Sequence, residues 1–395
     1  MKSFFYIPVF IFFSIFNYCQ KIPIVGYLGI PEHSTDIGNY ETMKKAGFSI
    51  SLMNFSDLDK ALYALNTAEK TGMKIILFFP QLHSEPQISI AKIKNHPALY
   101  GYFIGDEPFP SDFNNFIKYL DIIKAYDNNH AFYVNLNPNY APKERFGNIS
   151  YGEYVEQAIN KLPFSVISFD HYPLVRNKIR DGFYENLEVI SEQAKKSNKP
   201  FWAFACSTIH FDYLKPELAG IKLQQFSNLL YGAQGLQYFT YWTMTSDPNW
   251  IKDKYSYSIV DDRGNPTPTY DIVKSVNEQI QRLAWVFLGA RSNAVFHIGN
   301  HIPQGTKRLT SLPSSFSFFS TKGKDALISY MSNGNNEFII IQNKSLIQNL
   351  NLSYKLRSPL KKVNNNSGNI TTLLSSKKYS DIILPGDILI FVREK

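Results

Sequence analysis

The most regular feature of the sequence is the alternation of short apolar runs with amphipathic stretches over residues 20–290. The apolar runs lie at 24–30, 48–53, 74–79, 99–104, 131–135, 164–169, 201–206 and 236–242. The stretches between them predict helices at 57–71, 112–126, 151–162, 182–197 and 217–231, and a last helix at 269–287. Apolar strands that alternate with such helices are typical of a parallel sheet covered on both faces.

Repeated strand–helix units of this number and length are what a (β/α)8 TIM barrel requires, at about 250 residues in all. An open, doubly wound sheet is the alternative. However, the turn after the first run, Gly26-Tyr27-Leu28-Gly29, lacks the GxGxxG spacing of a dinucleotide-binding turn. We therefore predict an α/β fold with a barrel over residues 20–290.

The pattern changes at residue 291, after which no helical period is found. Short alternating stretches lie at 326–331, 337–342, 349–356, 370–374 and 382–392, separated by Gly, Asn and Ser turns. Strands at this spacing predict a small all-β sandwich over residues 291–395. The last run, 388–392, follows a Pro-Gly turn and is predicted to be a half-buried strand.

The N-terminus reads as a targeting segment. Lys2 is followed by an apolar run at 4–16 and then by a polar exit. This pattern predicts a signal peptide at residues 1–19 and export to the periplasm or the extracellular space, because the run is shorter than the ~20 apolar residues that span a bilayer. Cys19 is a lipidation alternative, but bulky Tyr18 precedes it, so cleavage near Gln20 is favoured.

Composition and charge limit the classes of function that this chain can have. The chain is 44% hydrophobic and 15% aromatic, which excludes a disordered protein. Its net charge of +8 comes from residues 291–395, which hold 14 Lys and Arg against 5 Asp and Glu. We expect weak attraction of this region to acidic polysaccharide, with a solvated basic face as the alternative. Because the basic residues are scattered, nucleic-acid binding is disfavoured. No metal or cofactor is predicted, since His83, His171 and His210 lack ligand spacing.

The chemistry of a barrel lies where its strands end, so the polar residues at these positions matter most. The fourth run ends in Asp106-Glu107-Pro108. Two adjacent carboxylates after an apolar strand are unfavourable unless they are solvated, form ion pairs or take part in function. Because the next helix has its own start signal at Ser111-Asp112, capping does not account for both, and we predict a catalytic role for them.

Further polar and aromatic residues follow the other strands. Asp170 is a third candidate catalytic carboxylate, after the sixth run. The candidate substrate-binding residues are Tyr27, Asn54, Gln81, His83, Asn135, Asn137, His171, Tyr172, Tyr241 and Trp242. A ring of neutral donors, acceptors and aromatic faces around acidic groups suits a neutral, hydroxyl-rich substrate better than a phosphate.

These motifs resemble those of retaining-type glycoside hydrolases with (β/α)8 barrels, in which a Glu-Pro pair after strand 4 supplies the general acid/base. Glu107-Pro108 matches that pair, and residues 231–242 are similar to the last strand of β-galactosidase-like enzymes, whose Trp contacts the sugar. A sandwich after the barrel is also common in them. The resemblance implies a secreted glycoside hydrolase with Glu107 as general acid, and with Tyr172 and Trp242 beside the sugar.

One position departs from the family pattern. Strand 7 of these enzymes ends in a nucleophilic Glu, whereas Ala205 occupies the matching place here. Three explanations remain. The Asp106-Glu107 pair also resembles that of substrate-assisted hexosaminidases, in which the substrate's 2-acetamido oxygen attacks and the Asp orients it. Alternatively Asp170, Asp212 or Glu217 supplies the second carboxylate, or the barrel has lost catalysis and only binds carbohydrate. Cys206 is a less favoured nucleophile, because a lone Cys at a strand end is usually inert.

Overall fold

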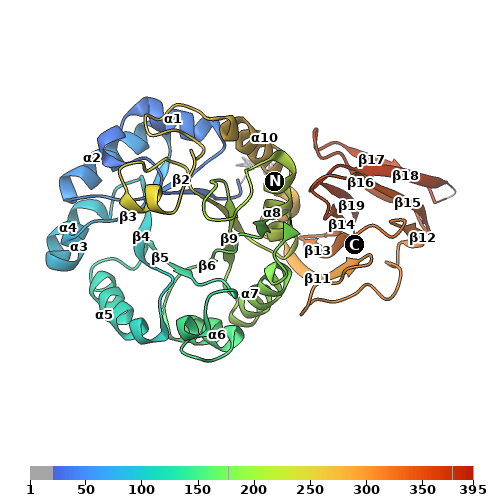
Figure 1. Cartoon of the computed structure of the whole chain (residues 1–395), viewed down its shortest axis with the longest axis horizontal. Coiled ribbons are helices and arrows are strands. Elements are labelled where there is room, and N and C mark those ends of the chain that lie inside the picture. Colours follow the sequence, from blue (N-terminus) through green and yellow to red (C-terminus); the bar gives the residue numbers. More distant parts are fainter. Residues whose placement is uncertain (1–20, 177, 376, 395) are drawn as a thin grey trace, which may run out of the picture.

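The computed structural model describes residues 21–176, 178–375 and 377–394, so the predicted signal peptide and Cys19 lie outside the described residues. The first part of the chain is a closed barrel of parallel strands in the order β1-β10-β9-β6-β5-β4-β3-β2 (Figure 1). These strands are β1 (Ile24–Tyr27), β2 (Ile50–Asn54), β3 (Lys74–Phe78), β4 (Leu99–Asp106), β5 (Ala131–Leu136), β6 (Ile167–Phe169), β9 (Phe201–Cys206) and β10 (Gly235–Phe239). The predicted α/β barrel is confirmed.

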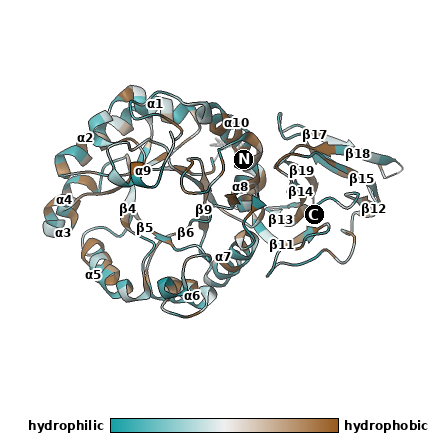
Figure 2. Cartoon of the chain, viewed as in Figure 1, coloured by the Kyte–Doolittle hydropathy of each residue, from teal (hydrophilic) through white to brown (hydrophobic). Residues whose placement is uncertain are grey.

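Helices surround the barrel and carry their apolar residues on the side that faces it (Figures 1 and 2). They are α1 (Ile37–Lys45), α2 (Leu58–Thr71), α3 (Gln81–Ser84), α4 (Pro86–Ile93), α5 (Phe113–Lys124), α6 (Tyr151–Lys161), α7 (Phe183–Ser197), α8 (Leu218–Leu230), α9 (Pro248–Lys252), α10 (Pro268–Arg282) and α11 (Ala284–Phe287). Short 3-10 turns lie at Glu32–Ser34, Pro110–Asp112 and Lys143–Phe146, and a small hairpin joins β7 (Leu174–Val175) to β8 (Lys178–Ile179).

Local signals in the sequence set where these helices begin and end. Asp57 caps α2 by accepting the backbone N–H of Lys60 at 2.8 Å, and Gly72 ends that helix in the left-handed conformation. Ser150 and Glu153 form a reciprocal capping box at the start of α6. These caps fix the lengths of the βα loops, and the loops carry the polar residues at the mouth of the barrel.

Apolar side chains fill the interior of the barrel. Residues such as Val25, Leu52, Ile76, Tyr133 and Trp202 meet inside the barrel, whereas the alternate residues of the same strands pack outward against the helices. This two-residue alternation is interrupted in β4, whose pairing shifts register against both β3 and β5. The irregular strand β4 is the one that ends in Asp106 and Glu107.

The C-terminal part of the chain is a sandwich of antiparallel sheets, as predicted. A six-stranded sheet has the order β11-β13-β14-β19-β16-β17, and a three-stranded sheet has the order β12-β15-β18. The strands are β11 (Arg291–Ile298), β12 (Phe316–Ser320), β13 (Ala326–Asn333), β14 (Asn336–Asn343), β15 (Leu350–Leu356), β16 (Leu360–Val363), β17 (Ile370–Leu373), β18 (Lys378–Ile383) and β19 (Ile388–Glu394). Their second core lies between the two sheets.

The six-stranded sheet also packs against the barrel. In β19, Leu389 and Phe391 face the sandwich core, while Ile388, Ile390 and Val392 join the core shared with α8 and α10. The run 388–392 is therefore buried on both faces, and the prediction of a half-buried strand was wrong. The reason is that the barrel covers the face that would otherwise meet solvent. Among the described residues, no helix is both long and apolar enough to cross a bilayer.

Candidate active site

Three neighbouring barrel strands bring polar residues together at their carboxyl ends. Asp106, the last residue of β4, pairs in register with Asn135 of β5, and Asn135 pairs with Ser168 of β6. Asp170 follows the end of β6. Because adjacent parallel strands end at the same rim, residues that are far apart in the sequence lie side by side here.

Asn135 joins the two aspartates. Its Nδ2 donates to Asp106 Oδ1 at 3.0 Å and to Asp170 Oδ1 at 2.8 Å, so both amide hydrogens are used. Its Oδ1 lies 2.8 Å from the Ser168 hydroxyl, which donates to it. Ser168 in turn belongs to a buried network with Tyr133 and Gln237 inside the barrel. The hydrogen bond from Ser168, inside the barrel, thus fixes the orientation of the Asn135 amide.

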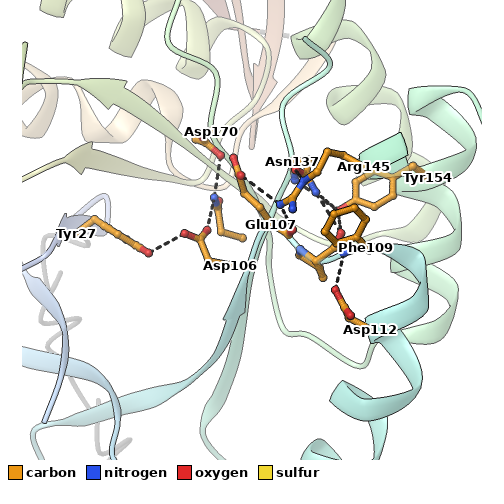
Figure 3. Close-up of polar contacts among 11 residues, drawn as sticks. Tyr27, Asp106, Glu107, Phe109, Asp112, Asn137, Arg145, Tyr154 and Asp170 are labelled. Carbon is orange, nitrogen blue, oxygen red and sulfur yellow. Dashed lines mark hydrogen bonds and ion pairs between the residues drawn. The ribbon is translucent and has the colours of Figure 1, made fainter. Parts of the chain in front are cut away.

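Asp106 is held from the opposite side by Tyr27, whose hydroxyl donates to Asp106 Oδ2 at 3.0 Å (Figure 3). Although solvent reaches Asp106, the dense packing around its carboxylate desolvates it and raises its pKa. The hydrogen bonds from Asn135 and Tyr27 oppose that shift, because they stabilise the charged form. Of the three acidic groups, Asp106 therefore receives the strongest support as an anion.

Glu107 occupies a turn that is held by an arginine. Its φ of 44° lies in the left-handed region, and its N–H donates to Asn135 O at 2.8 Å. Arg145 donates to both the backbone O and Oε2 of Glu107, the latter at 3.4 Å, and its guanidinium lies 4.2 Å from the centre of the Phe109 ring (Figure 3). Asn137 accepts from Arg145 Nε at 3.1 Å. The turn is thus fixed through its backbone and its side chain together.

The surroundings of Glu107 favour its protonated form. Desolvation raises the pKa of the carboxyl, the charge of Asp106 raises it further, and the Arg145 guanidinium opposes both effects. The net shift is upward even though the side chain is 37% exposed. A carboxyl group with a raised pKa that solvent can still reach is suited to donate a proton to a ligand.

Asp170 is the most deeply placed of the three carboxyl groups, at 6% exposure. Burial raises its pKa well above the usual value, and the charges of Glu107 and Asp106 add to this effect. Figure 3 shows the carboxyl groups of Glu107 and Asp170 turned toward one another. Ionisation of Asp106 or Glu107 therefore disfavours ionisation of Asp170.

An aromatic wall closes the other side of the barrel mouth. Tyr172, Phe204 and Cys206 form a buried cluster, against which Tyr27, Tyr213 and Phe239 pack. Phe239 is the last residue of β10, and its ring lies 5.4 Å from that of Tyr172 and 5.8 Å from that of Tyr27. Such rings offer apolar faces next to the carboxylates, which suits the apolar face of a sugar.

The directions of the side chains of β9, the seventh barrel strand, show where Ala205 lies relative to the acidic cluster. Ala203 and Ala205 pack outward with the helix-facing core, whereas Trp202, Phe204 and Cys206 point into the barrel. The inward position at the end of this strand is therefore that of Cys206, and Ala205 faces away from the carboxylates. The Cys206 thiol is buried, and desolvation raises its pKa to about 12, so it stays protonated and is a poor nucleophile.

Several predicted substrate-binding residues lie at the cluster but serve as supports. Asn137 is fully buried and donates to the backbone O of Pro108 at 3.1 Å. His171 donates from Nδ1 to Asn186 Oδ1 at 3.1 Å, because Asn186 Oδ1 already accepts a backbone N–H and must be the acceptor. Burial lowers the pKa of His171 to about 3, so its ring is neutral. Tyr27 and Asn135 contact the carboxylates directly, and burial together with the charge of Asp170 raises the pKa of Tyr172.

Other predicted residues are not brought to the cluster. Tyr241 and Trp242 are each 1% exposed and belong to the core beneath the loop after β10, since that strand ends at Phe239. His83 stacks on Tyr119 of α5 at 3.7 Å, in the helix layer, and Gln81 begins α3 beside it. Asn54 is exposed at the end of β2.

Four further residues lie at the barrel mouth that were not predicted from the sequence: Arg145, Tyr140, Arg180 and Phe239. Arg180 lies over the Tyr140 ring at 4.0 Å, and the Tyr140 hydroxyl is 3.3 Å from that of Tyr213. No spacing rule marks loop residues of this kind. Only Phe239 carried a signal, as an aromatic residue within the eighth apolar run. Among the described residues, no group of His, Cys, Asp and Glu is arranged to hold a metal ion.

The fold of this chain is similar to that of known structures, although its sequence is not similar to known families. No protein-family model matches the sequence, and no curated protein is significantly similar to it. Among solved structures, the chain is similar to a catalytic mutant of Gan42B, a GH42 beta-galactosidase from G. stearothermophilus. The TM-score is 0.65 at 8% identity, over 95% of this chain and 98% of that one. The chain therefore shares the fold of this beta-galactosidase.

Two further structures agree over most of the chain. A family 39 glycoside hydrolase from the gut symbiont Bacteroides cellulosilyticus has a TM-score of 0.54 at 9% identity, covering 95% of this chain and 81% of that one. An Anoxybacillus alpha-amylase has a TM-score of 0.52 at 11% identity, covering 95% and 98%. The expected resemblance to glycoside hydrolase barrels is therefore confirmed at the level of the fold.

Proposed function

We propose that this chain is an exported glycoside hydrolase that cleaves O-glycosidic bonds of oligo- or polysaccharides. The observation that carries the proposal is the acidic cluster at the ends of β4 and β6, where Asn135 holds Asp106 and Asp170 together beside Glu107. Two carboxyl groups that flank one bond are what glycoside hydrolysis requires. The fold shared with glycoside hydrolases supports the same reading.

In this proposal Glu107 is the general acid. Its pKa is raised and its side chain meets solvent, so it can protonate the leaving oxygen of a bound glycoside. Arg145 keeps the turn in place and limits how far the pKa rises. The acid must return to its protonated form in each cycle, and the charge of Asp106 favours that return.

Asp170 is the second carboxylate. It is preferred to Asp212 and Glu217 because those two are exposed, Asp212 in an ion pair with Arg176 at 3.0 Å and Glu217 at the start of α8. Asp170 instead lies within the acidic cluster, where the hydrogen bond from Asn135 at 2.8 Å stabilises its ionised form against the effect of burial. In the ionised form it acts on the anomeric carbon directly or through a water molecule, according to the separation of the two groups.

The substrate-assisted scheme differs in giving the orienting role to Asp106. Its hydrogen bonds from Tyr27 and Asn135 favour the ionised form, which that role requires. A substrate with a 2-acetamido group then needs no attacking side chain. This scheme predicts a strong preference for 2-acetamido glycosides, whereas a role for Asp170 as nucleophile or base predicts none.

The decisive experiment uses Glu107→Gln in the mature chain, assayed on a panel of aryl glycosides with and without a 2-acetamido group. We expect kcat/KM to fall by about 10²–10⁴, the range that general acid catalysis supplies. Because Glu217→Gln changes an exposed carboxylate outside the cluster, it is the matched control and should keep full activity. Both variants should retain the thermal unfolding midpoint of the parent.

Two outcomes would contradict the proposal. Unchanged turnover in Glu107→Gln would exclude the acid assignment. If the unmodified protein cleaves none of the glycosides yet binds oligosaccharide, the alternative of a noncatalytic carbohydrate-binding protein is favoured. Export through residues 1–19 is part of the proposal and is tested separately, by sequencing the N-terminus of the secreted chain.

A further inference from the structure

A pocket lies between the barrel and the sandwich, and none of its lining residues belongs to the acidic cluster. It has a volume of about 360 Å³. The barrel contributes the segment 179–184 and the sandwich contributes loops around His301, Lys324 and Lys344. This volume is near the lower end of the range for small-molecule sites, about 300–1,000 Å³, and domain boundaries are common places for such sites.

The most unusual group in the pocket is Lys344. This side chain is 6% exposed, although lysine is rarely buried without a partner. Its ammonium lies 3.2 Å from His297 Nδ1 and 5.0 Å from the centre of the Tyr184 ring. Among the described residues, no carboxylate lies within 4.0 Å of this nitrogen. The positive charge is therefore held by an imidazole and an aromatic face.

The imidazole that contacts Lys344 is itself neutral. His297 Nδ1 accepts from the ammonium, so its Nε2 carries the hydrogen and donates to the Tyr231 hydroxyl at 3.2 Å. Burial and the nearby charge of Lys344 lower the pKa of His297 to about 2. His297 therefore adds no positive charge to the pocket, and it cannot neutralise Lys344 either.

The nearest acidic residue of the pocket is engaged elsewhere. Asp325 Oδ1 accepts the backbone N–H of His301 at 3.2 Å, and this oxygen also packs against Gly299. The other carboxylate, Asp181, is exposed at the rim, as is Lys324. Asp325 acts on Lys344 through its charge, which opposes the lowering of the Lys344 pKa by burial, but it forms no ion pair with it. Lys344 lines this cavity with no carboxylate of the described residues within 4.0 Å of its ammonium, and a bound anion would supply one.

We propose that this pocket binds an acidic sugar unit, a uronic acid, through a charge-assisted hydrogen bond from Lys344 to the sugar's carboxylate. The sugar part of this assignment rests on the proposed function, whereas the anion part rests on the pocket alone. The site would hold an acidic branch or a neighbouring unit of a polysaccharide whose main chain meets the catalytic cluster. It also gives the basic sandwich a specific point of contact with acidic polysaccharide.

The test is calorimetric titration of the mature Glu107→Gln chain with D-glucuronate and D-galacturonate, with D-glucose and D-galactose as neutral counterparts and acetate as the anion without a ring. We expect a uronate to bind at least about tenfold more tightly than its neutral counterpart, a difference of ~1.4 kcal/mol. Lys344→Met should abolish that preference. Lys322→Met alters an exposed lysine of the adjacent turn and should leave it unchanged.

A second measurement tests the proposal without relying on the folding of Lys344→Met. In the unmodified chain, uronate should shield Lys344 from reductive methylation, followed by mass spectrometry, whereas the neutral sugar should not. Equal binding of uronate and hexose, or equal binding by Lys344→Met and the parent, would overturn the proposal. Acetate binding as tightly as uronate would overturn the sugar assignment. Because the titrations use a chain without Glu107, failure of the glycosidase proposal would leave their result intact.

Discussion

The two sides of the barrel mouth differ sharply. The rim formed by β4, β5 and β6 carries Asp106, Glu107, Asn135 and Asp170, all joined by hydrogen bonds or close charges. The rim formed by β9 and β10 ends in Cys206 and Phe239, an apolar thiol and an aromatic ring. In the family that the sequence resembles, strand 7 supplies the second carboxylate, yet here it supplies none.

The proposed chemistry is therefore confined to one side of the barrel mouth. Proton transfer and the stabilisation of positive charge must come from the β4–β6 rim, because the β9–β10 rim offers only packing. A substrate would therefore lie with its reacting bond toward the acidic rim and a sugar face on Phe239 and Tyr172.

The largest effect is expected for Asp170→Asn. If Asp170 is the second carboxylate, kcat/KM falls by about 10²–10⁴, because the amide cannot act as base or nucleophile. Steady-state assays on the aryl glycoside that the parent cleaves best provide the measurement. Asp212→Asn alters an exposed carboxylate after β9 and serves as the control. Activity near that of the parent in Asp170→Asn would favour the substrate-assisted scheme.

Trp242→Ala should chiefly affect stability. The side chain is 1% exposed in the core, so its truncation should lower the free energy of unfolding by about 3–5 kcal/mol. Urea denaturation measures this loss. In contrast, Phe239→Leu should raise KM with little loss of stability, because Phe239 lies at the mouth of the barrel. The opposite pattern would mean that Trp242 contacts substrate.

Asp170→Asn should also change how stability depends on pH. Burial raises the pKa of Asp170 above its ordinary 3.8, so the folded state holds this proton more tightly than the unfolded state. Stability is therefore lost as pH rises from the ordinary pKa through the raised one. Thermal unfolding between pH 4 and pH 8 should show a smaller loss for Asp170→Asn than for the parent. Equal losses would show that Asp170 is ionised without penalty.

Arg145→Met should move the pH–rate profile. Since the Arg145 guanidinium lowers the pKa of Glu107, its removal should raise that pKa. A general acid is active only while protonated, so the alkaline limb of kcat/KM should move to higher pH. Arg145→Lys, which keeps a positive charge, should restore much of the original profile. A fall in rate at every pH with no movement of the limb would indicate a structural role alone.

Cys206→Ser should have the smallest effect. The thiol is buried and protonated, and its Sγ contacts the backbone O of Thr208 at 3.2 Å. We expect kcat/KM to stay within about threefold of the parent, since a difference below ~0.7 kcal/mol is all that such a packing change implies. Treatment of the parent with iodoacetamide should likewise leave activity intact. A large loss in either experiment would make the β9–β10 rim part of the chemistry.

Much of the fold could be read directly from the sequence. The apolar run at 201–206 coincides with β9, and the run at 74–79 exceeds β3 by one residue. Strand β10 was harder, because Tyr241 and Trp242 continue the apolar run after the strand has ended at Phe239. Burial of a loop by tertiary contacts gives the same apolar pattern as a strand, so the pattern could not mark that end.

The candidate site was predicted in part. Asp106, Glu107 and Asp170 stand out because charged groups after apolar strands demand an explanation. The outward direction of Ala205 and the role of Arg145 were hidden, because each depends on neighbours from other strands and loops. The register shifts in β4 also prevent simple alternation from giving the direction of Asp106.

The pattern of apolar and polar residues was sufficient to predict a helix-covered parallel barrel, a sandwich after it, and acidic residues at the ends of two strands. It did so because periodicity and local turn chemistry are properties of neighbouring residues. Tertiary contacts were needed to establish that Asn135 bridges the two aspartates, that β9 and β10 end in Cys206 and Phe239, and that Lys344 lies buried between the domains. Those facts depend on strand register and on the packing of distant segments, which no local pattern encodes.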